Sequence, residues 1–167
     1  MNDHASDLRV CALAVHFREI GDTRMRELPF YNAQLSVEAC GFTHFDESDL
    51  IGVLVTPWFM NLMLLPLEQA PVDPTRFGQA RGIPLPGGSR RFVYGGDEGI
   101  GAYWAHSLHS PMHAFGSQAH ACNEARGVLA QVLAAKPAVP RVDSPGRRAF
   151  LAGWRPMAPV VPDRAET

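Results

Sequence analysis

The residues of this chain whose types and spacing could bind a metal ion are three histidines, His106, His109 and His113. On a helix, steps of three and four residues would bring all three to one face, as a zinc or nickel site requires. Pro111 argues against a helix there, and on a strand His106 and His109 would point to opposite faces. The sequence therefore predicts no metal site and no cofactor, with His106 and His109 as the alternative ligands.

The three cysteines, Cys11, Cys40 and Cys122, are widely separated and odd in number. Their spacing matches neither a disulfide framework nor a zinc motif, and the chain has no Cys-x-x-Cys redox pair. Cys11 falls on an apolar helix face, Cys40 in a strand-like segment and Cys122 beside alanines. We therefore predict that all three are small, buried hydrophobic residues.

Motifs that would indicate catalysis are missing from the sequence. It contains no Gly-x-Ser-x-Gly elbow, no phosphate-binding loop and no His-Glu-x-x-His. Gly99-Ile100-Gly101 lacks the third glycine and the βαβ context of a dinucleotide site. A net charge of -2 argues against nucleic-acid binding, which requires a basic surface. These observations favour a binding protein over an enzyme.

The elements that would position functional residues are organised around the run Leu50–Pro66, which contains no charged side chain. The run is too short, and too interrupted by Pro57 and Asn61, to cross a bilayer, which takes about 20 apolar residues. It is therefore predicted to form the centre of a protein core.

Two local structures fit this run. Either buried strands at 50–55 and 59–65 are joined by a tight turn at Pro57 and Trp58, or Thr56 caps a helix that opens with Pro57. A helix there would be apolar on every side and would need neighbours all round, which favours the strands. Asn61 would then be a buried amide that needs hydrogen-bond partners.

Apolar residues at helical spacing predict two helices. The first is capped by Ser6 and ends near Ile20, and the second covers 117–135. The first apolar stripe consists of Leu8, Cys11, Ala12, Val15, Phe17 and Ile20, and the second of Ala121, Cys122, Ala125, Val128, Leu129, Val132 and Leu133.

Further strands are predicted around the central run. Residues 35–42 begin with alternating apolar and polar residues, which indicates a strand with one solvent-exposed face. Glu38 would lie on that face and be solvated. Residues 91–94 and 100–108 read as two strands joined by a glycine-rich turn. The glycines and prolines of 71–88 favour an irregular connection.

At 167 residues, 46% of them hydrophobic, the chain can bury one sizeable core. We predict a single α+β domain over residues 1–136, mainly an antiparallel sheet with an N-terminal and a C-terminal helix packed on it. Residues 137–167 are rich in proline and are predicted to form a flexible tail. The first residues do not resemble a secretion signal, so we expect a cytoplasmic protein.

Several ordered blocks of the sequence resemble one known family. The central block, Gly52–Pro66, reads Gly-Val-Leu-Val-Thr-Pro-Trp-Phe-Met-Asn-Leu-Met-Leu-Leu-Pro. The flanking blocks are Arg24-Met25, Leu28-Pro29, Asn32, Val37-Glu38-Ala39 and Gly41-Phe42 before it, and Gly101-Ala102-Tyr103, Ser107-Leu108, Ser110-Pro111-Met112 and Phe115 after it. Together they are similar to the HybE-type chaperones of nickel-iron hydrogenase assembly.

The resemblance implies a non-enzymatic accessory protein that binds the precursor of the hydrogenase small subunit, through its twin-arginine signal peptide. The large subunit is a further candidate partner, and neither nucleic acid nor membrane insertion is expected. The signal's apolar stretch would lie as a helix in a groove of methionines and aromatic anchors, with carboxylates receiving its arginines. The candidate binding residues are Trp58, Phe59, Met60, Asn61, Met63, Tyr103, Trp104 and Met112, with Glu38, Asp97 and Glu98 as the carboxylates.

The tail contains Arg147-Arg148-Ala149-Phe150-Leu151, which is similar to the twin-arginine motif of exported redox proteins. No long apolar segment follows it, and Pro156 and Pro159 interrupt the sequence, so it cannot act as an export signal. Either it is a basic piece of tail, or Arg147, Arg148, Phe150 and Leu151 imitate the client's signal and occupy the same groove.

An alternative function of a different class also fits the resemblance. The protein would protect or deliver a metal centre of the hydrogenase, using His106, His109 and the cysteines as ligands.

Overall fold

The structure, a computed structural model, describes residues 2–135 of the chain. The proline-rich segment 137–167, with Arg147, Arg148, Phe150 and Leu151, lies outside the described residues. In chain order the elements are α1 (Asn2–Ile20), η1 (Gly21–Met25), β1 (Glu38–His44), β2 (Asp49–Val55), β3 (Met60–Pro66), η2 (Pro74–Arg76), β4 (Ala80–Ile83), β5 (Arg90–Asp97), β6 (Gly101–His109) and α2 (Gln118–Leu133).

The central apolar run forms the neighbouring antiparallel strands β2 and β3. Ile51 and Val53 point into one core cluster, whereas Leu50 and Leu54 point into another on the opposite face of the sheet. Because both faces of these strands are buried, the run reads as continuously apolar rather than alternating. The predicted pair of strands is confirmed, and the alternative of a helix after Thr56 is wrong.

Thr56 closes the hairpin between β2 and β3. Its N–H donates to the carbonyl of Phe59 at 2.8 Å, and its hydroxyl oxygen accepts from the N–H groups of Trp58 and Phe59 at 3.2 and 2.9 Å. The residue is fully buried. Its hydroxyl therefore supplies the hydrogen-bond acceptor that water cannot provide to these turn amides.

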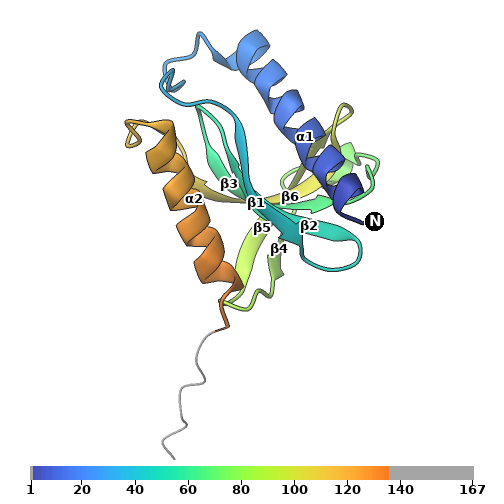
Figure 1. The fold of residues 1–167 in the computed structure, drawn as a ribbon. Helices are drawn as coiled ribbons and strands as arrows, with labels where there is room; N and C mark the ends of the chain where they lie inside the picture. The colour runs from blue at the N-terminus through green and yellow to red at the C-terminus, as the bar shows by residue number, and fades with distance from the viewer. Residues whose placement is uncertain (1, 136–167) are drawn as a thin grey trace, which may run out of the picture. The chain divides into compact units, whose positions relative to one another are not determined.

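The sheet has the strand order β1-β2-β3-β6-β5-β4, and every neighbouring pair is antiparallel. Figure 1 shows α1 and α2 on opposite sides of this sheet. Helix α1 contributes Leu13 and Phe17 to the core on its face, and α2 contributes Ala125 and Leu129 to the core on the other. The predicted α+β class, an antiparallel sheet with an N-terminal and a C-terminal helix, is confirmed.

Helix α1 begins at Asn2, so Ser6 lies inside the helix and the prediction that it caps the helix is wrong. The predicted apolar face is also wrong in part. Leu8 and Val15 are 58% and 52% exposed, and Cys11 and Ala12 are exposed as well. Phe17 is buried as predicted, and the rest of the buried side of the helix is formed by Arg9, Leu13 and Ala14.

The buried side of α1 includes an arginine, which apolar spacing does not predict. Nε of Arg9 donates to the carbonyl of Pro66 at 2.9 Å, and Nη2 donates to the carbonyl of Ile100 at 2.7 Å. These carbonyls belong to the end of β3 and to the turn between β5 and β6. Arg9 can therefore be buried against the sheet, because two backbone carbonyls accept hydrogen bonds from its guanidinium.

The two edge strands of the sheet, β1 and β4, differ from the prediction for their residues. Residues 71–88 are not wholly irregular, because β4 lies within them and pairs with β5 through Gly82 and Ile83. Strand β1 begins at Glu38 rather than at Leu35. Both differences occur at edge strands, where pairing with a single neighbour defines the element.

Helix α2 follows its prediction closely. Ser117 is its N-cap, and the Ser117 hydroxyl accepts from the N–H of His120 at 3.2 Å. Its apolar stripe is buried at Ala121, Cys122, Ala125, Leu129 and Val132. Among residues 2–135, none of the helices combines the length and hydrophobicity that a transmembrane span requires.

Candidate functional site

A groove with a volume of about 740 Å³ runs between α1 and the edge strand β1. Helix α1 contributes residues from Asp3 to Arg18 to one wall, and β1 forms most of the other. The groove is lined by Asp3, Ser6, Asp7, Val10, Cys11, Ala14, Arg18, Glu38, Ala39, Gly41, Phe42, Thr43, His44 and Leu50.

This lining combines an apolar floor with charged walls. Val10, Ala14 and Phe42 are partly or fully buried and pack against the core cluster beneath α1. Asp3 and Asp7 are exposed carboxylates on the helix side of the groove. A segment with paired cations and an apolar stretch has matching chemistry, because it can bury the apolar part while its charges meet the carboxylates.

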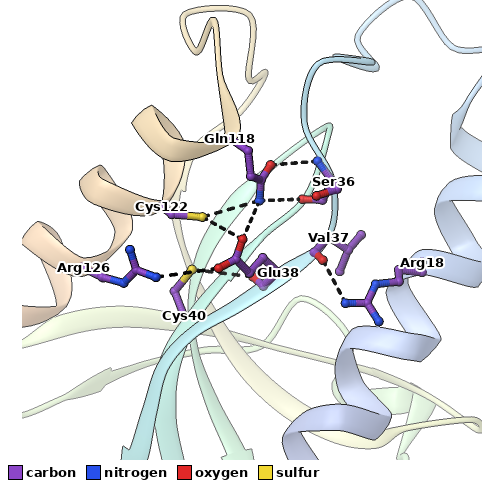
Figure 2. A network of polar contacts seen from close by, with 8 residues as sticks. All are labelled: Arg18, Ser36, Val37, Glu38, Cys40, Gln118, Cys122 and Arg126. Carbon is purple, nitrogen blue, oxygen red and sulfur yellow. Dashed lines mark hydrogen bonds and ion pairs between the residues drawn. The ribbon is translucent and has the colours of Figure 1, made fainter.

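Glu38 also lines the groove, but its carboxylate is already engaged (Figure 2). Oε2 accepts from Nε2 of Gln118 at 3.0 Å and from Sγ of Cys122 at 3.1 Å, and Oε1 lies 3.8 Å from Nη2 of Arg126. These hydrogen bonds, the one from Gln118 first, lower the pKa of Glu38. The prediction of a merely solvated Glu38 is wrong, because β1 faces α2 at this position.

Five of the predicted binding residues lie in the core. Trp58 and Trp104 are 7% and 8% exposed, and Met60, Met63 and Met112 are fully buried. The ring of Trp58 stacks on Tyr31 with centroids 6.1 Å apart. A partner could reach these side chains only if the core opened.

Three predicted residues are half-buried on the α1 face of the sheet. The rings of Phe59 and Tyr103 lie 5.7 and 6.3 Å from the ring of Phe17 on α1. Burial raises the pKa of Tyr103. Asn61 pairs across the ladder with Leu54 and is half-buried rather than buried. Phe59 and Tyr103 therefore contribute to the surface on which α1 packs.

The histidines do not form a cluster with one another. His106 pairs with Leu62 and His109 with Met60, and a register shift between β3 and β6 separates the two pairs. Leu62 and Met60 share one core face, so the shift brings both histidines to the α2 side. The expectation of opposite faces is wrong because it assumed a regular strand.

Each of these histidines has its own neighbours. Nδ1 of His106 lies 2.8 Å from the carbonyl oxygen of Arg91, and Nε2 of His109 lies 3.4 Å from a carboxylate oxygen of Glu124. Within residues 2–135, neither belongs to a set of three or more side chains that could hold a metal ion.

The cysteines divide into one exposed and two buried residues. Cys11 is exposed, so its predicted burial is wrong, whereas Cys40 and Cys122 are buried as predicted. The two buried thiols are not purely apolar, because both lie beside Glu38 (Figure 2). Burial, together with the hydrogen bond to Glu38, raises the pKa of Cys122 to about 12, and burial also raises the pKa of Cys40.

The carboxylates proposed alongside Glu38 lie elsewhere. Asp97 and Glu98 line a different groove, of about 430 Å³, which takes its α1 residues from His16 to Ile20. Oδ1 of Asp97 lies 3.2 Å from Nε2 of His16. The structure therefore does not bring Glu38 together with Asp97 and Glu98.

The fold defines a small α+β protein with an antiparallel six-stranded sheet, one helix on each face and a groove beside its first strand. Comparisons with known proteins agree on where such a chain belongs. Residues 8–153 match the family described as NiFe-hydrogenase assembly, chaperone, HybE. The chain is a member of this family, and its function is that of a hydrogenase assembly chaperone.

Individual relatives are consistent with the family match. A hydrogenase expression/formation protein HupJ of Bradyrhizobium diazoefficiens is 38% identical over 121 residues, which cover 72% of this chain and 69% of that protein. A probable rubredoxin HupJ of Rhodobacter capsulatus is 38% identical over 130 residues, 78% of this chain, and the chain spans only 46% of that protein's length.

A solved structure is similar as well. The solution structure of HybE from Escherichia coli aligns with a TM-score of 0.59 and 26% sequence identity, covering 88% of this chain and 90% of that one. The likeness therefore extends over nearly the whole of both folds.

Proposed function

We propose that this chain holds the precursor of a nickel-iron hydrogenase small subunit on the cytoplasmic side, before export and before pairing with the large subunit. In this proposal it binds the twin-arginine signal peptide of that precursor. The observation that supports the proposal is the groove between α1 and β1, because it joins an apolar floor to exposed carboxylates.

Asp3 and Asp7 are the carboxylates that we assign to the two arginines. They lie one helical turn apart on the same side of α1, and both line the groove. Glu38, which the sequence suggested for this role, is held by Gln118 and Cys122. The apolar stretch of the signal would follow as a helix along Val10, Ala14 and Phe42.

The aromatic residues have an indirect role in this proposal. Phe59 and Tyr103 contact Phe17, and Trp58 packs in the same cluster, so these side chains position α1 and with it the wall of the groove. Their replacement would change the shape of the groove without removing a direct contact.

Calorimetric titration with the signal peptide, and with a version whose paired arginines are lysines, tests the proposal. We expect saturable one-to-one binding that weakens with lysine, which cannot reproduce the bidentate fork of arginine. The double variant Asp3→Asn/Asp7→Asn should bind about tenfold more weakly or worse, since a hydrogen bond to a charged group contributes roughly 1.5–3 kcal/mol.

The matched control is Glu19→Gln/Glu27→Gln, which removes the same charge from residues that do not line this groove. Equal weakening in both double variants would indicate a general charge effect and argue against this groove. Absence of binding by either peptide would overturn the proposed recognition of the signal, and the body of the small subunit would become the next ligand to test.

The tail supplies a second test of the same groove. A flexible tether gives an effective concentration on the order of millimolar, so a mimic with micromolar affinity would suppress client binding about a thousandfold. If Arg147, Arg148, Phe150 and Leu151 imitate the signal, deletion of residues 144–167 tightens binding of the signal peptide. Unchanged affinity would reject this role for the tail.

A further inference from the structure

Two buried thiols and one carboxylate converge between the edge strand β1 and helix α2 (Figure 2). Glu38 and Cys40 come from β1, and Cys122 comes from α2. One ligand atom from each residue lies within 4.8 Å of the other two. Within residues 2–135, no other three histidine, cysteine, aspartate or glutamate side chains meet this closely.

These distances are close to those around a tetrahedral metal ion. With Zn–S bonds of about 2.3 Å and Zn–O bonds of about 2.0–2.2 Å, neighbouring ligand atoms lie roughly 3.5–3.8 Å apart. Sγ of Cys122 and Oε2 of Glu38 are 3.1 Å apart, joined by a hydrogen bond that an ion would replace. Side-chain movements on the order of 1 Å or less would therefore complete the geometry.

The surroundings of the three ligands suit a cation. Two thiolates and one carboxylate carry three negative charges, so a divalent ion leaves one, and the guanidinium of Arg126, 3.8 Å from Glu38, offsets it. Gln118 donates to Oε2 of Glu38 at 3.0 Å, and its Oε1 accepts from the N–H of Ser36 at 2.9 Å. Such a partner orients a ligating carboxylate in the way that outer residues of metal sites do.

We propose that Glu38, Cys40 and Cys122 form a binding site for one divalent transition-metal ion that prefers thiolate ligands, with Zn²⁺ as the reference ion. Binding replaces the two thiol protons by metal–sulfur bonds and releases them to solvent, with no change of oxidation state. Mg²⁺ and Ca²⁺ are excluded, because they take sets of six or more oxygen ligands.

Three protein ligands leave one position of a tetrahedral ion open. Closed structural zinc sites use four protein ligands, whereas sites with three hold an exchangeable water or another molecule in the fourth position. The proposed ion could therefore take one further ligand, from solvent or from a partner.

Anaerobic titration of the reduced full-length chain with Co²⁺, followed by Zn²⁺, tests the site. We expect one Co²⁺ per chain, with the near-ultraviolet thiolate-to-cobalt absorption and the intense visible bands of a tetrahedral ion. Zn²⁺ should displace the Co²⁺ and abolish both absorptions. Replacing a residue that only orients a metal ligand costs about 10–100-fold in metal affinity. Loss of a ligand should cost more, so Cys40→Ser and Cys122→Ser should each bind Co²⁺ about a hundredfold more weakly or worse. Glu38→Gln keeps one side-chain oxygen and should bind Co²⁺ about tenfold more weakly.

Two controls separate this site from adventitious binding. Cys11→Ser removes the exposed thiol, and His106→Gln/His109→Gln removes the histidines, and neither should change the cobalt spectrum or the affinity. Absence of thiolate-to-cobalt absorption in the unaltered chain would overturn the proposal. Loss of the spectrum in Cys11→Ser or in the histidine variant, with its retention in Cys122→Ser, would also overturn it.

The thiol variants could also lose metal because the fold is disturbed. Circular dichroism of each variant therefore accompanies the titration, and Cys40→Ala and Cys122→Ala provide apolar replacements for the buried thiols. A folded alanine variant that binds Co²⁺ as tightly as the unaltered chain contradicts the assignment of that cysteine.

Discussion

Sγ of Cys122 on α2 lies 3.1 Å from Oε2 of Glu38 on β1, and this contact joins residues 84 positions apart in the chain. The thiol donates and the carboxylate accepts, which stabilises a protonated cysteine beside an ionised glutamate. The contact thus links the edge strand to the helix that covers it.

Cys122 should react slowly with thiol reagents for this reason. Its pKa of about 12 leaves a thiolate fraction on the order of one in ten thousand at pH 8, and its side chain is buried. Alkylation of metal-free protein by iodoacetamide, followed by mass spectrometry, should modify the exposed Cys11 first. In Cys11→Ser the fast phase should disappear, and comparable rates for Cys11 and Cys122 would contradict the contact.

Gly52 should be essential to the packing of β1 on β2. A Cβ at this position would lie 2.4 Å from the ring and 2.8 Å from Cα of Phe42, so the backbone itself must shift to admit it. Gly52→Ala should lower the free energy of unfolding by about 1–3 kcal/mol or more in urea titrations, the usual cost of overpacking.

Gly127 offers the matched control for this prediction. It lies within α2, and an added Cβ would meet no atom within 4 Å. Gly127→Ala should therefore raise the free energy of unfolding by about 0.5–1 kcal/mol, through the better helix propensity of alanine. Similar changes at both glycines would show that steric contact with Phe42 is not the cause.

Arg9 should be required for docking of α1. Arg9→Met removes the donors to the carbonyls of Pro66 and Ile100. We expect a loss of about 3–6 kcal/mol in the free energy of unfolding, since each of the two hydrogen bonds from the charged group contributes roughly 1.5–3 kcal/mol. Near-ultraviolet circular dichroism would report the altered packing of aromatic residues under the helix.

Two further variants define the role of the Arg9 guanidinium. The free energy of unfolding of Arg9→Lys should lie between those of the unaltered protein and Arg9→Met, because one ammonium cannot reach both carbonyls in the same geometry. Arg26→Met removes an exposed arginine whose partner is Asp22, one turn away, and should cost no more than about 0.5 kcal/mol. Equal losses at Arg9 and Arg26 would contradict a specific role for the buried residue.

Asp46 should make the hairpin between β1 and β2 sensitive to acid. Hydrogen bonds from the Ser48 N–H, the Asp49 N–H and the Ser48 hydroxyl hold the pKa of Asp46 below its usual value. Because the folded pKa is lowered, this stabilisation is present above the unfolded pKa of about 3.9 and is lost as pH falls through the lower folded pKa.

The variant Asp46→Asn tests this dependence. It should be less stable than the unaltered protein near neutral pH, and the difference should narrow as the pH falls below about 4. Glu47→Gln removes the same charge from the neighbouring exposed residue and should show no such narrowing. Urea unfolding at several pH values measures both, and a constant difference for Asp46→Asn would refute the assignment.

The central hairpin and α2 could be predicted from the sequence because their signals are local. The uncharged run Leu50–Pro66 requires burial, and Pro57 marks a turn. Ser117 and the apolar spacing from Ala121 to Val132 mark the start and the buried face of α2. The ordered blocks from Arg24 to Phe115 also predicted the family, which the family match over residues 8–153 confirms.

The face of α1 and the strand β4 were decided by partners elsewhere in the chain. Arg9 is buried because the carbonyls of Pro66 and Ile100, 57 and 91 positions away, satisfy it. Apolar spacing alone therefore selected Leu8 and Val15 in error. Strand β4 exists through its pairing with β5, and the glycines and prolines around it conceal it in the sequence.

By itself the sequence determined the apolar hairpin, the second helix, the α+β class and the family, because each of these depends on neighbouring residues or on an ordered pattern. Only the tertiary structure decided which polar groups meet. It placed Glu38, Cys40 and Cys122 together across two elements, and the register shift in β6 moved His109 to the same face as His106. Contacts between residues far apart in the chain have no spacing in the sequence, so folding alone brings such groups within reach of one another.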